Sequence, residues 1–80
     1  MKEGAVVKEL DVSKMPTPER HPRIFQTFDG LQKGEAFLLI NDHDPKPLRY
    51  QFMHERENMF SWEYVQEGPD LWKVKITKTA

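Results

Sequence analysis

The chain has 80 residues, with 12 Lys and Arg against 13 Asp and Glu, so its formal net charge is −1. This length predicts a single domain that buries roughly 60% of its unfolded surface, and therefore modest stability. The basic residues are scattered among carboxylates and form no stripe that follows phosphates. We therefore expect no nucleic acid partner.

Composition and hydropathy exclude or disfavour further classes. The sequence has no cysteine, which excludes disulfides, thiolate nucleophiles, persulfides and thiolate-ligated clusters. No window approaches 18 apolar residues, and charged residues resume soon after the first Met, so we expect neither a membrane span nor a signal peptide. The prediction is a cytoplasmic protein without a membrane partner.

Alternating apolar residues predict a first strand over residues 6–12, after a disordered stretch at 1–5. A proline-rich segment follows. Pro22 limits the next helix, because a proline in a helix interior costs about 3 kcal/mol. We therefore expect the regular helix to begin near Glu19 or Arg20 and to end at Asp29-Gly30. The apolar positions expected in the core are Val6, Leu10 and Val12 of the strand and Ile24, Phe25, Phe28 and Leu31 of the helix.

A nearly continuous apolar run at 35–40 predicts a strand that is buried on both sides or lies in the middle of the sheet, and we expect it to be central. A second helix is expected from Pro45 to about Arg56. Asp44 precedes it as a natural N-cap, because its carboxylate can accept hydrogen bonds from free helix N–H groups. The core face of this helix is expected to consist of Leu48, Phe52 and Met53.

Two alternating strands at 59–65 and 71–77, joined by turn residues at 67–70, predict an antiparallel hairpin. The resulting order is βαβαββ. With right-handed crossovers it predicts an α+β two-layer sandwich, in which two helices cover one face of a mixed four-stranded sheet. We assign residues 6–78 to this single α/β domain. The hairpin aromatics Phe60, Trp62, Tyr64 and Trp72 are expected in the core, although the pattern leaves open whether some lie on the bare face and form a partner-binding patch.

Several segments resemble a prokaryotic domain family of unknown function, and the resemblance covers residues 9–77. The matching segments are LDV at 10–12, PERHPRIF at 18–25, NDHDPKPLRYQF at 41–52, WEY at 62–64, EGP at 67–69 and WKV at 72–74. That family resembles the TusA/SirA-like sulfur-carrier superfamily, which implies the same βαβαββ fold. Its members occur alone, fused to hemerythrin-like domains, or beside genes of anaerobic nitrogen-oxide metabolism. The resemblance implies an accessory role near metal or redox proteins, and no established activity comes with it.

The chain departs from the sulfur carriers at their reactive position. Where they have Cys-Pro-x-Pro, this sequence has Met15-Pro16-Thr17-Pro18. A thioether cannot be deprotonated or hold a persulfide, so the resemblance implies the fold without sulfur-carrier chemistry. A cysteine-free relative that still docks sulfur-transfer partners remains one alternative.

The polar triplet Asn41, Asp42 and His43 follows the central strand, at the edge where open α/β sheets usually bind ligands. Since both helices start along this edge, we expect His21 to approach His43. Two imidazoles and a carboxylate suit Zn, Fe or Cu, but the same side chains can also simply bond loop backbone and cap helices. Asp42 and Asp44 would need a buried cleft to serve as acid and base, so we do not expect catalysis.

Three arginines, Arg20, Arg23 and Arg49, are expected in the early turns of the two helices. Together with free helix N–H groups they suit an anion, a phosphate or a partner's carboxylate. The alternative is surface pairing with nearby carboxylates, which contributes about 0–1 kcal/mol per pair. His54 is expected on the surface.

We predict a small cytoplasmic, non-enzymatic binding or accessory module for a protein partner or small anionic ligand. The predicted binding residues are Arg20, His21, Arg23, Asn41, Asp42, His43 and Arg49. An alternative is a metal-binding domain with His21 and His43 as ligands, which makes a metal ion the one cofactor to consider.

Overall fold

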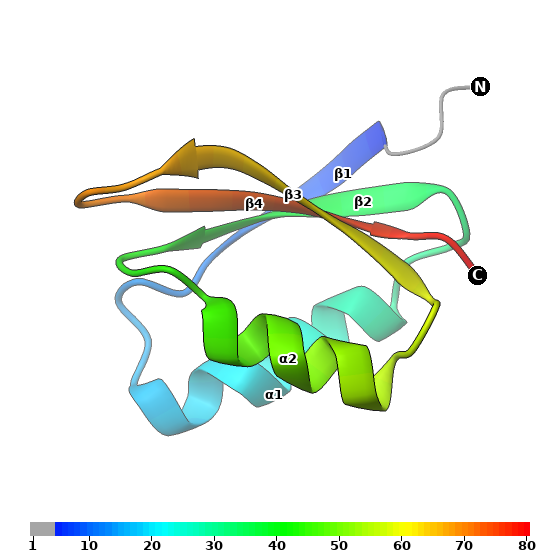
Figure 1. Ribbon diagram of the computed structural model, residues 1–80, viewed down its shortest axis with the longest axis horizontal. Helices are drawn as coiled ribbons and strands as arrows, with labels where there is room; N and C mark the ends of the chain where they lie inside the picture. The colour runs from blue at the N-terminus through cyan, green and yellow to red at the C-terminus, as the bar shows by residue number, and fades with distance from the viewer. Residues whose placement is uncertain (1–4) are drawn as a thin grey trace.

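The computed structural model describes residues 5–80 and contains one sheet with two helices on one face (Figure 1). The elements are β1 (Ala5–Asp11), α1 (Thr17–Asp29), β2 (Glu35–Asn41), α2 (Lys46–Glu55), β3 (Phe60–Glu67) and β4 (Trp72–Lys78). The strand order is β1-β2-β4-β3, with β1 parallel to β2 and the other neighbours antiparallel. The predicted βαβαββ order and mixed four-stranded two-layer architecture are confirmed.

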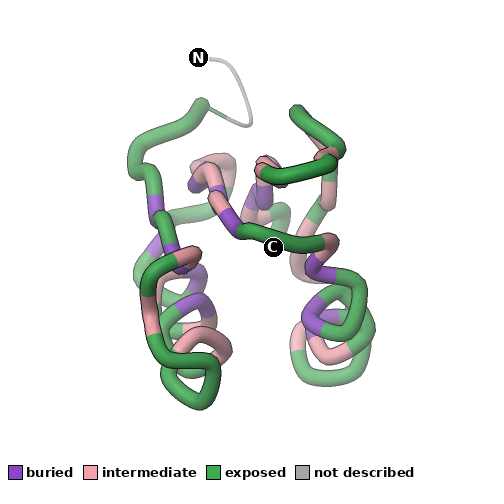
Figure 2. The backbone as a smooth tube through the Cα atoms, turned by 90° about the vertical axis from the view of Figure 1, so that its left-hand side faces the viewer, coloured by how far each residue is buried: buried purple, intermediate pink, exposed green. Residues whose placement is uncertain are grey.

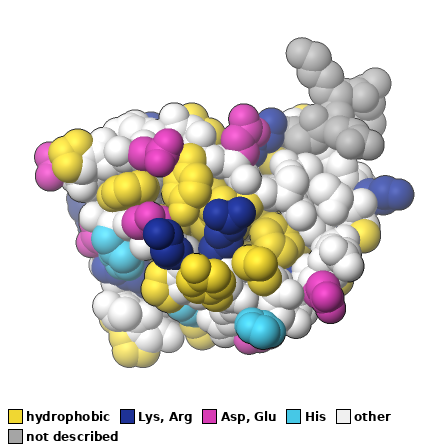
Figure 3. Space-filling view, viewed as in Figure 1, with side chains coloured by type: hydrophobic (Ala, Val, Ile, Leu, Met, Phe, Trp, Pro, Cys, Tyr) yellow, Lys and Arg dark blue, Asp and Glu magenta, His cyan; other side chains and the backbone are white. Residues whose placement is uncertain are grey.

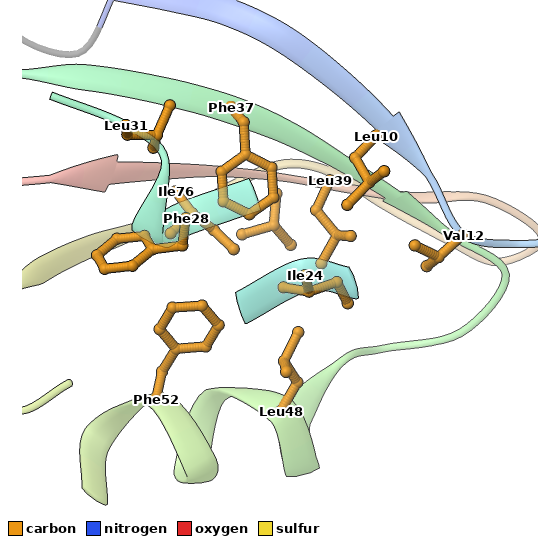
Figure 4. Packing of buried hydrophobic residues seen from close by; sticks show 11 residues of the cluster. Leu10, Val12, Ile24, Phe28, Leu31, Phe37, Leu39, Leu48, Phe52 and Ile76 are labelled. Atoms are coloured by element: carbon orange, nitrogen blue, oxygen red, sulfur yellow. The ribbon is translucent and has the colours of Figure 1, made fainter. Parts of the chain in front are cut away.

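The hydrophobic core lies between the sheet and the helices. In Figure 4, Ile24 and Phe28 of α1 and Leu48 and Phe52 of α2 point toward the sheet. The buried positions in Figure 2 lie where the two layers face each other. β2 is central, as predicted, since it pairs with both β1 and β4. The core cluster consists of Leu10, Val12, Ile24, Phe28, Leu31, Phe37, Leu39, Leu48, Phe52, Val74 and Ile76.

Two predicted core positions are wrong. Val6 is 47% exposed, because the register of β1 shifts between Val6 and Lys8 and the alternation is interrupted there. Met53 is 51% exposed, because the buried residues of α2 are Leu48 and Phe52 and Met53 lies beside this face. Residues 1–4 of the predicted disordered stretch lie outside the described residues, and Ala5 belongs to β1.

Both predicted helix starts also need correction. α1 begins at Thr17, with Pro18 in its first two positions and Pro22 inside. The Glu19 N–H donates to the Pro16 carbonyl at 2.9 Å, so the chain is already wound before Pro22 is reached. Pro22 is the sixth residue of α1, beyond its first turn, so the helix lacks one interior hydrogen bond there and nevertheless continues to Asp29.

α2 begins at Lys46, with Pro45 at the cap position and no side-chain cap. The predicted cap, Asp44, instead accepts a hydrogen bond from the Tyr64 hydroxyl at 2.8 Å. Burial of the phenol, followed by this hydrogen bond to the carboxylate, raises the pKa of Tyr64. Asp44 therefore links the start of α2 to strand β3.

The hairpin aromatics lie on the helix-covered face, which answers the question that the pattern left open. Trp62 and Tyr64 pair with Ile76 and Val74, whose side chains are in the core. The turn fits around Trp72: Gly68 has φ 64°, and a Cβ there would lie 2.8 Å from the Trp72 indole. Only glycine meets both conditions without strain. No helix within residues 5–80 is long and apolar enough to cross a membrane.

Candidate functional site

The starts of α1 and α2 meet at one edge of the sheet, because β1 and β2 are parallel and each is followed by a helix (Figure 1). A pocket of about 40 Å³ lies between these starts. Its floor is apolar and its rim carries four of the predicted binding residues. The lining residues are Thr17, Arg20, His21, Ile24, Asn41, His43, Pro45, Pro47 and Leu48.

Arg20 forms one wall of the pocket with a side chain that is only 12% exposed. Its Nε donates to the Met15 carbonyl at 2.9 Å and its Nη2 to the Ser13 carbonyl at 3.1 Å. Its Nη1 donates to Asn41 Oδ1 at 3.0 Å and to Asp42 Oδ1 at 3.1 Å. The guanidinium thus ties the loop after β1 to the end of β2. Arg20 holds the site together and is not a free anion-binding arm.

Asp42 is the acceptor at the centre of the rim. Besides Arg20, the ring Nδ1 of His43 donates to its Oδ1 at 2.7 Å. The hydrogen bond from His43, followed by that from Arg20, lowers the pKa of Asp42 below its usual 3.8. Asn41 is buried beside it, and its Oδ1 also accepts the Asp42 backbone N–H at 2.9 Å. The predicted triplet therefore forms one connected network.

His21 belongs to a different chain of hydrogen bonds, which crosses from α1 to α2. Gln51 Nε2 donates to Glu55 Oε2 at 2.8 Å, so the other end of the amide presents its oxygen to His21. That oxygen lies 2.8 Å from His21 Nδ1, which must therefore carry the proton. The free lone pair of neutral His21 is on Nε2.

His43 carries its proton on the same ring nitrogen as His21, but a different hydrogen-bond partner determines this. Because its Nδ1 donates to a carboxylate, its Nε2 is also left without the proton in the neutral ring. Within residues 5–80, neither Nε2 forms a hydrogen bond. His43 is exposed, with 62% of its side chain accessible, whereas His21 is partly buried. The two imidazoles of one pocket thus keep the same ring nitrogen available.

Two predicted binding residues lie outside this pocket. Arg23 is exposed on α1 and does not line it. Arg49 is exposed on the side of α2 that faces β3, where its charge acts on Tyr64. His54 is exposed on α2, as predicted. The structure therefore brings together Arg20, His21, Asn41, Asp42 and His43, but not the two remaining arginines.

Gln51 is a site residue that the sequence analysis did not assign. It lies three positions after Leu48 on α2, and this spacing places the two on adjoining parts of one helix face. That spacing was the available signal that Gln51 faces the other helix. For the metal alternative, no group of three or more His, Asp or Glu side chains in the described chain is placed to hold an ion.

The lowered pKa of Asp42 predicts a pH-dependent contribution to stability. A carboxylate with a depressed folded-state pKa stabilises the fold above its usual value of 3.8, and this contribution is lost as pH falls through the lowered pKa. We expect Asp42→Asn to lower the melting temperature at about pH 6, and the difference from the unsubstituted protein to shrink as pH falls through the lowered pKa of Asp42. Thermal unfolding over this range measures the effect.

Asp70→Asn is the matched control, because Asp70 is exposed in the hairpin turn and accepts no side-chain hydrogen bond among the described residues. Its melting temperature should follow the unsubstituted protein at every pH. A difference for Asp42→Asn that persists unchanged to acid pH would show that the carboxylate charge is not what matters.

The comparisons with known proteins identify a family. A family model described as "Uncharacterized conserved protein (DUF2249)" matches residues 9–78. Neither the curated proteins nor the solved structures contain a match to the chain. The match includes β2, α2, both hairpin strands, and the loops that form the pocket. This protein therefore belongs to the DUF2249 family, whose members share an uncharacterized conserved domain.

Proposed function

We propose that this protein is a small non-enzymatic binding module that takes up a carboxylate or similar small anion, free or on a partner protein, between the helix starts. The observation that carries the proposal is the pair of imidazoles at one pocket, each held through Nδ1 with Nε2 available. A protonated imidazole donates from Nε2, so His21 and His43 offer two charged donors to one ligand.

The charges around the pocket favour an anion over a cation. Both helices begin there without a side-chain cap, and although Pro18 and Pro47 have no N–H, the other free N–H groups of each first turn add partial positive charge. The positive charge of Arg20 and the negative charge of Asp42 offset each other in their ion pair, so the charge that favours an anion comes from the helix starts and from the protonated imidazoles. The volume of about 40 Å³ limits the ligand to one small group.

A metal site is the second candidate, and one specific feature favours it. Metal-binding histidines usually donate their second ring nitrogen to a carboxylate or carbonyl oxygen, and His21 and His43 are both held in this way. The two Nε2 atoms would supply two ligands suited to Zn, Fe or Cu, and a partner or solvent would have to supply the others.

The kinship with sulfur carriers and the link to redox or nitrogen-oxide metabolism stay predictions. Met15, at the position of their reactive cysteine, is partly buried against the core, and its carbonyl accepts from Arg20. Its thioether is therefore used for packing. Docking of a sulfur-transfer partner would have to use the surface around the pocket rather than this side chain.

The two candidates predict opposite pH dependences at the same residues. Anion binding should be stronger at about pH 5.5 than at about pH 8, because only the protonated form of an imidazole carries the positive charge that attracts an anion. Metal binding should strengthen as pH rises, because the ligand must be the neutral ring. Titrating the isotope-labelled protein with acetate, phosphate and Zn²⁺ at both pH values measures the two affinities.

Single alanine variants identify the groups that carry the binding. We expect His21→Ala and His43→Ala each to weaken acetate binding by about tenfold, the value of one charge-assisted hydrogen bond. His54→Ala is the matched control, because His54 is exposed on α2 and does not line the pocket. An equal loss in all three variants, or binding that does not change with pH, would contradict the proposal.

A further inference from the structure

A second surface, separate from the pocket, lies between helix α2 and the edge strand β3. We call it the α2–β3 groove and define it by Arg49 and Met53 of α2 and Phe60, Trp62 and Tyr64 of β3. The β3 aromatics contact the core but stay partly accessible, and Met53 is 51% exposed. Figure 3 shows hydrophobic side chains gathered between α2 and β3, with Lys and Arg side chains among them.

One end of the groove is hollowed. A depression of about 280 Å³ is lined by Met53, Glu57, Asn58 and Phe60. The other end is formed by Tyr64, whose hydroxyl is bonded to Asp44, and by Arg49, whose charge acts on Tyr64. The hollow end therefore carries the Glu57 carboxylate, and the opposite end carries the Arg49 guanidinium together with the Asp44 carboxylate that the Tyr64 hydroxyl holds.

The strand beside the groove has a free edge. Within the part of the chain that the structure describes, β3 is the last strand of the sheet and pairs only with β4, so about half of its backbone N–H and C=O groups point away from the sheet. Pairing is regular from Phe60 to Tyr64, and a register shift follows before Gln66. A regular edge strand next to a groove with aromatic side chains is the arrangement to which extended peptides add as an extra strand.

Arg49 makes the groove selective for charge. Its exposed guanidinium forms no hydrogen bond or ion pair with any other residue of the described chain. By contrast, Arg20 and Arg56 are both engaged with carboxylates. An acidic side chain would therefore be favoured near Arg49 and disfavoured near Glu57. Because the Asp44 carboxylate is already bonded to the Tyr64 hydroxyl, the free guanidinium of Arg49 still distinguishes this end of the groove from the Glu57 end.

From these observations we propose that the α2–β3 groove binds an extended segment of a partner protein, which adds to β3 as a further strand. The segment places an apolar side chain against Met53 and Phe60 and an acidic side chain at Arg49. Phe60 and Tyr64 are four residues apart on the same face, about 13 Å along the strand. The apolar and acidic residues of the partner are therefore also four apart, with a third inward side chain between them opposite Trp62.

The probe is a synthetic peptide of this pattern, acetyl-Thr-Leu-Thr-Val-Thr-Asp-Thr-amide, together with the peptide of reversed sequence, since the strand can add in either direction. We expect saturable backbone shifts in 60–64 and at Met53 of the isotope-labelled protein. Arg49→Glu should weaken binding by about tenfold, and a peptide with Lys in place of Asp should restore it. Arg23→Glu, an exposed arginine outside the groove, is the control and should change nothing.

Three results would overturn the proposal. One is a lack of saturation by both peptides. Another is an equal loss with Arg23→Glu and Arg49→Glu, which would indicate general charge attraction. The third is a set of β3 shifts that depend on protein concentration without peptide, which would assign the edge to a second copy of the chain. Because His21 and His43 lie outside the groove, acetate binding at the pocket is measured separately from all of these.

Discussion

Phe52→Ala is expected to lower the free energy of unfolding by about 3–5 kcal/mol, the usual cost of removing a fully buried aromatic side chain. Phe52 is fully buried, and its ring stacks on Phe25 at a centroid distance of 4.4 Å. It also meets the edges of Phe28 and Trp62 at 5.2 and 6.0 Å. A domain of this size has about 4–12 kcal/mol in total, so the loss removes at least about a quarter of the stability, and all of it at the lower end of that range. Chemical denaturation followed by circular dichroism measures the loss.

Met53→Ala is the matched control, since it truncates the neighbouring residue of the same helix. Met53 is exposed, so its substitution should change the free energy of unfolding by less than about 0.5 kcal/mol. Similar losses for the two variants would mean that the buried face of α2 is not the one described. This control also verifies that Met53 variants can be used to study the α2–β3 groove.

Arg20→Ala is expected to lower the free energy of unfolding by about 2–3 kcal/mol and the melting temperature by about 10–20 °C. The substitution removes the donors that join the Ser13 and Met15 carbonyls to Asn41. These acceptors lie at the edge where the two helices start, so the pocket should open as the loop after β1 loosens. Thermal unfolding and backbone amide exchange in residues 13–15 measure both effects.

Two further variants, Arg20→Lys and Arg23→Ala, separate the loss of the Arg20 hydrogen bonds from general effects of charge. A lysine keeps the charge but cannot supply the fork of donors, so most of the loss should remain. Arg23 is exposed, and its removal should be nearly neutral. Full stability in Arg20→Lys would show that only the charge at this position matters.

The fold could be predicted because its signals are periodic. Runs such as 35–40 and the alternation in 71–77 identify strands, while the spacing from Ile24 to Leu31 identifies a helix face. The predictions that were wrong concern residues whose positions depend on tertiary contacts. Asp is a residue type that often caps helices, so Asp44 was expected to bond the first N–H groups of α2. Its carboxylate instead accepts the hydroxyl of Tyr64, which is 20 residues away in the sequence. Met53 was misplaced because α2 buries only a narrow face.

The site could be predicted in position but not in the roles of its residues. Parallel strands necessarily bring the two loops to one edge, so the proximity of His21 and His43 follows from topology. The role of Arg20 does not follow from topology, because its side chain bonds backbone carbonyls, and no sequence pattern indicates which carbonyls a side chain will reach. Arg49 was grouped with the pocket because helix position alone does not tell which side of α2 a residue occupies.

The central claim, that one pocket presents the Nε2 atoms of two histidines, is tested most directly by the ring nitrogen spectrum of the protein. A long-range proton–nitrogen correlation near neutral pH distinguishes a ring that is protonated on Nδ1 from one protonated on Nε2. The hydrogen bonds to Gln51 and Asp42 predict the proton on Nδ1 in neutral His21 and His43, and acetate should shift both rings but not that of His54. Protons on Nε2 in both rings, or an equal acetate shift at His54, would contradict the account.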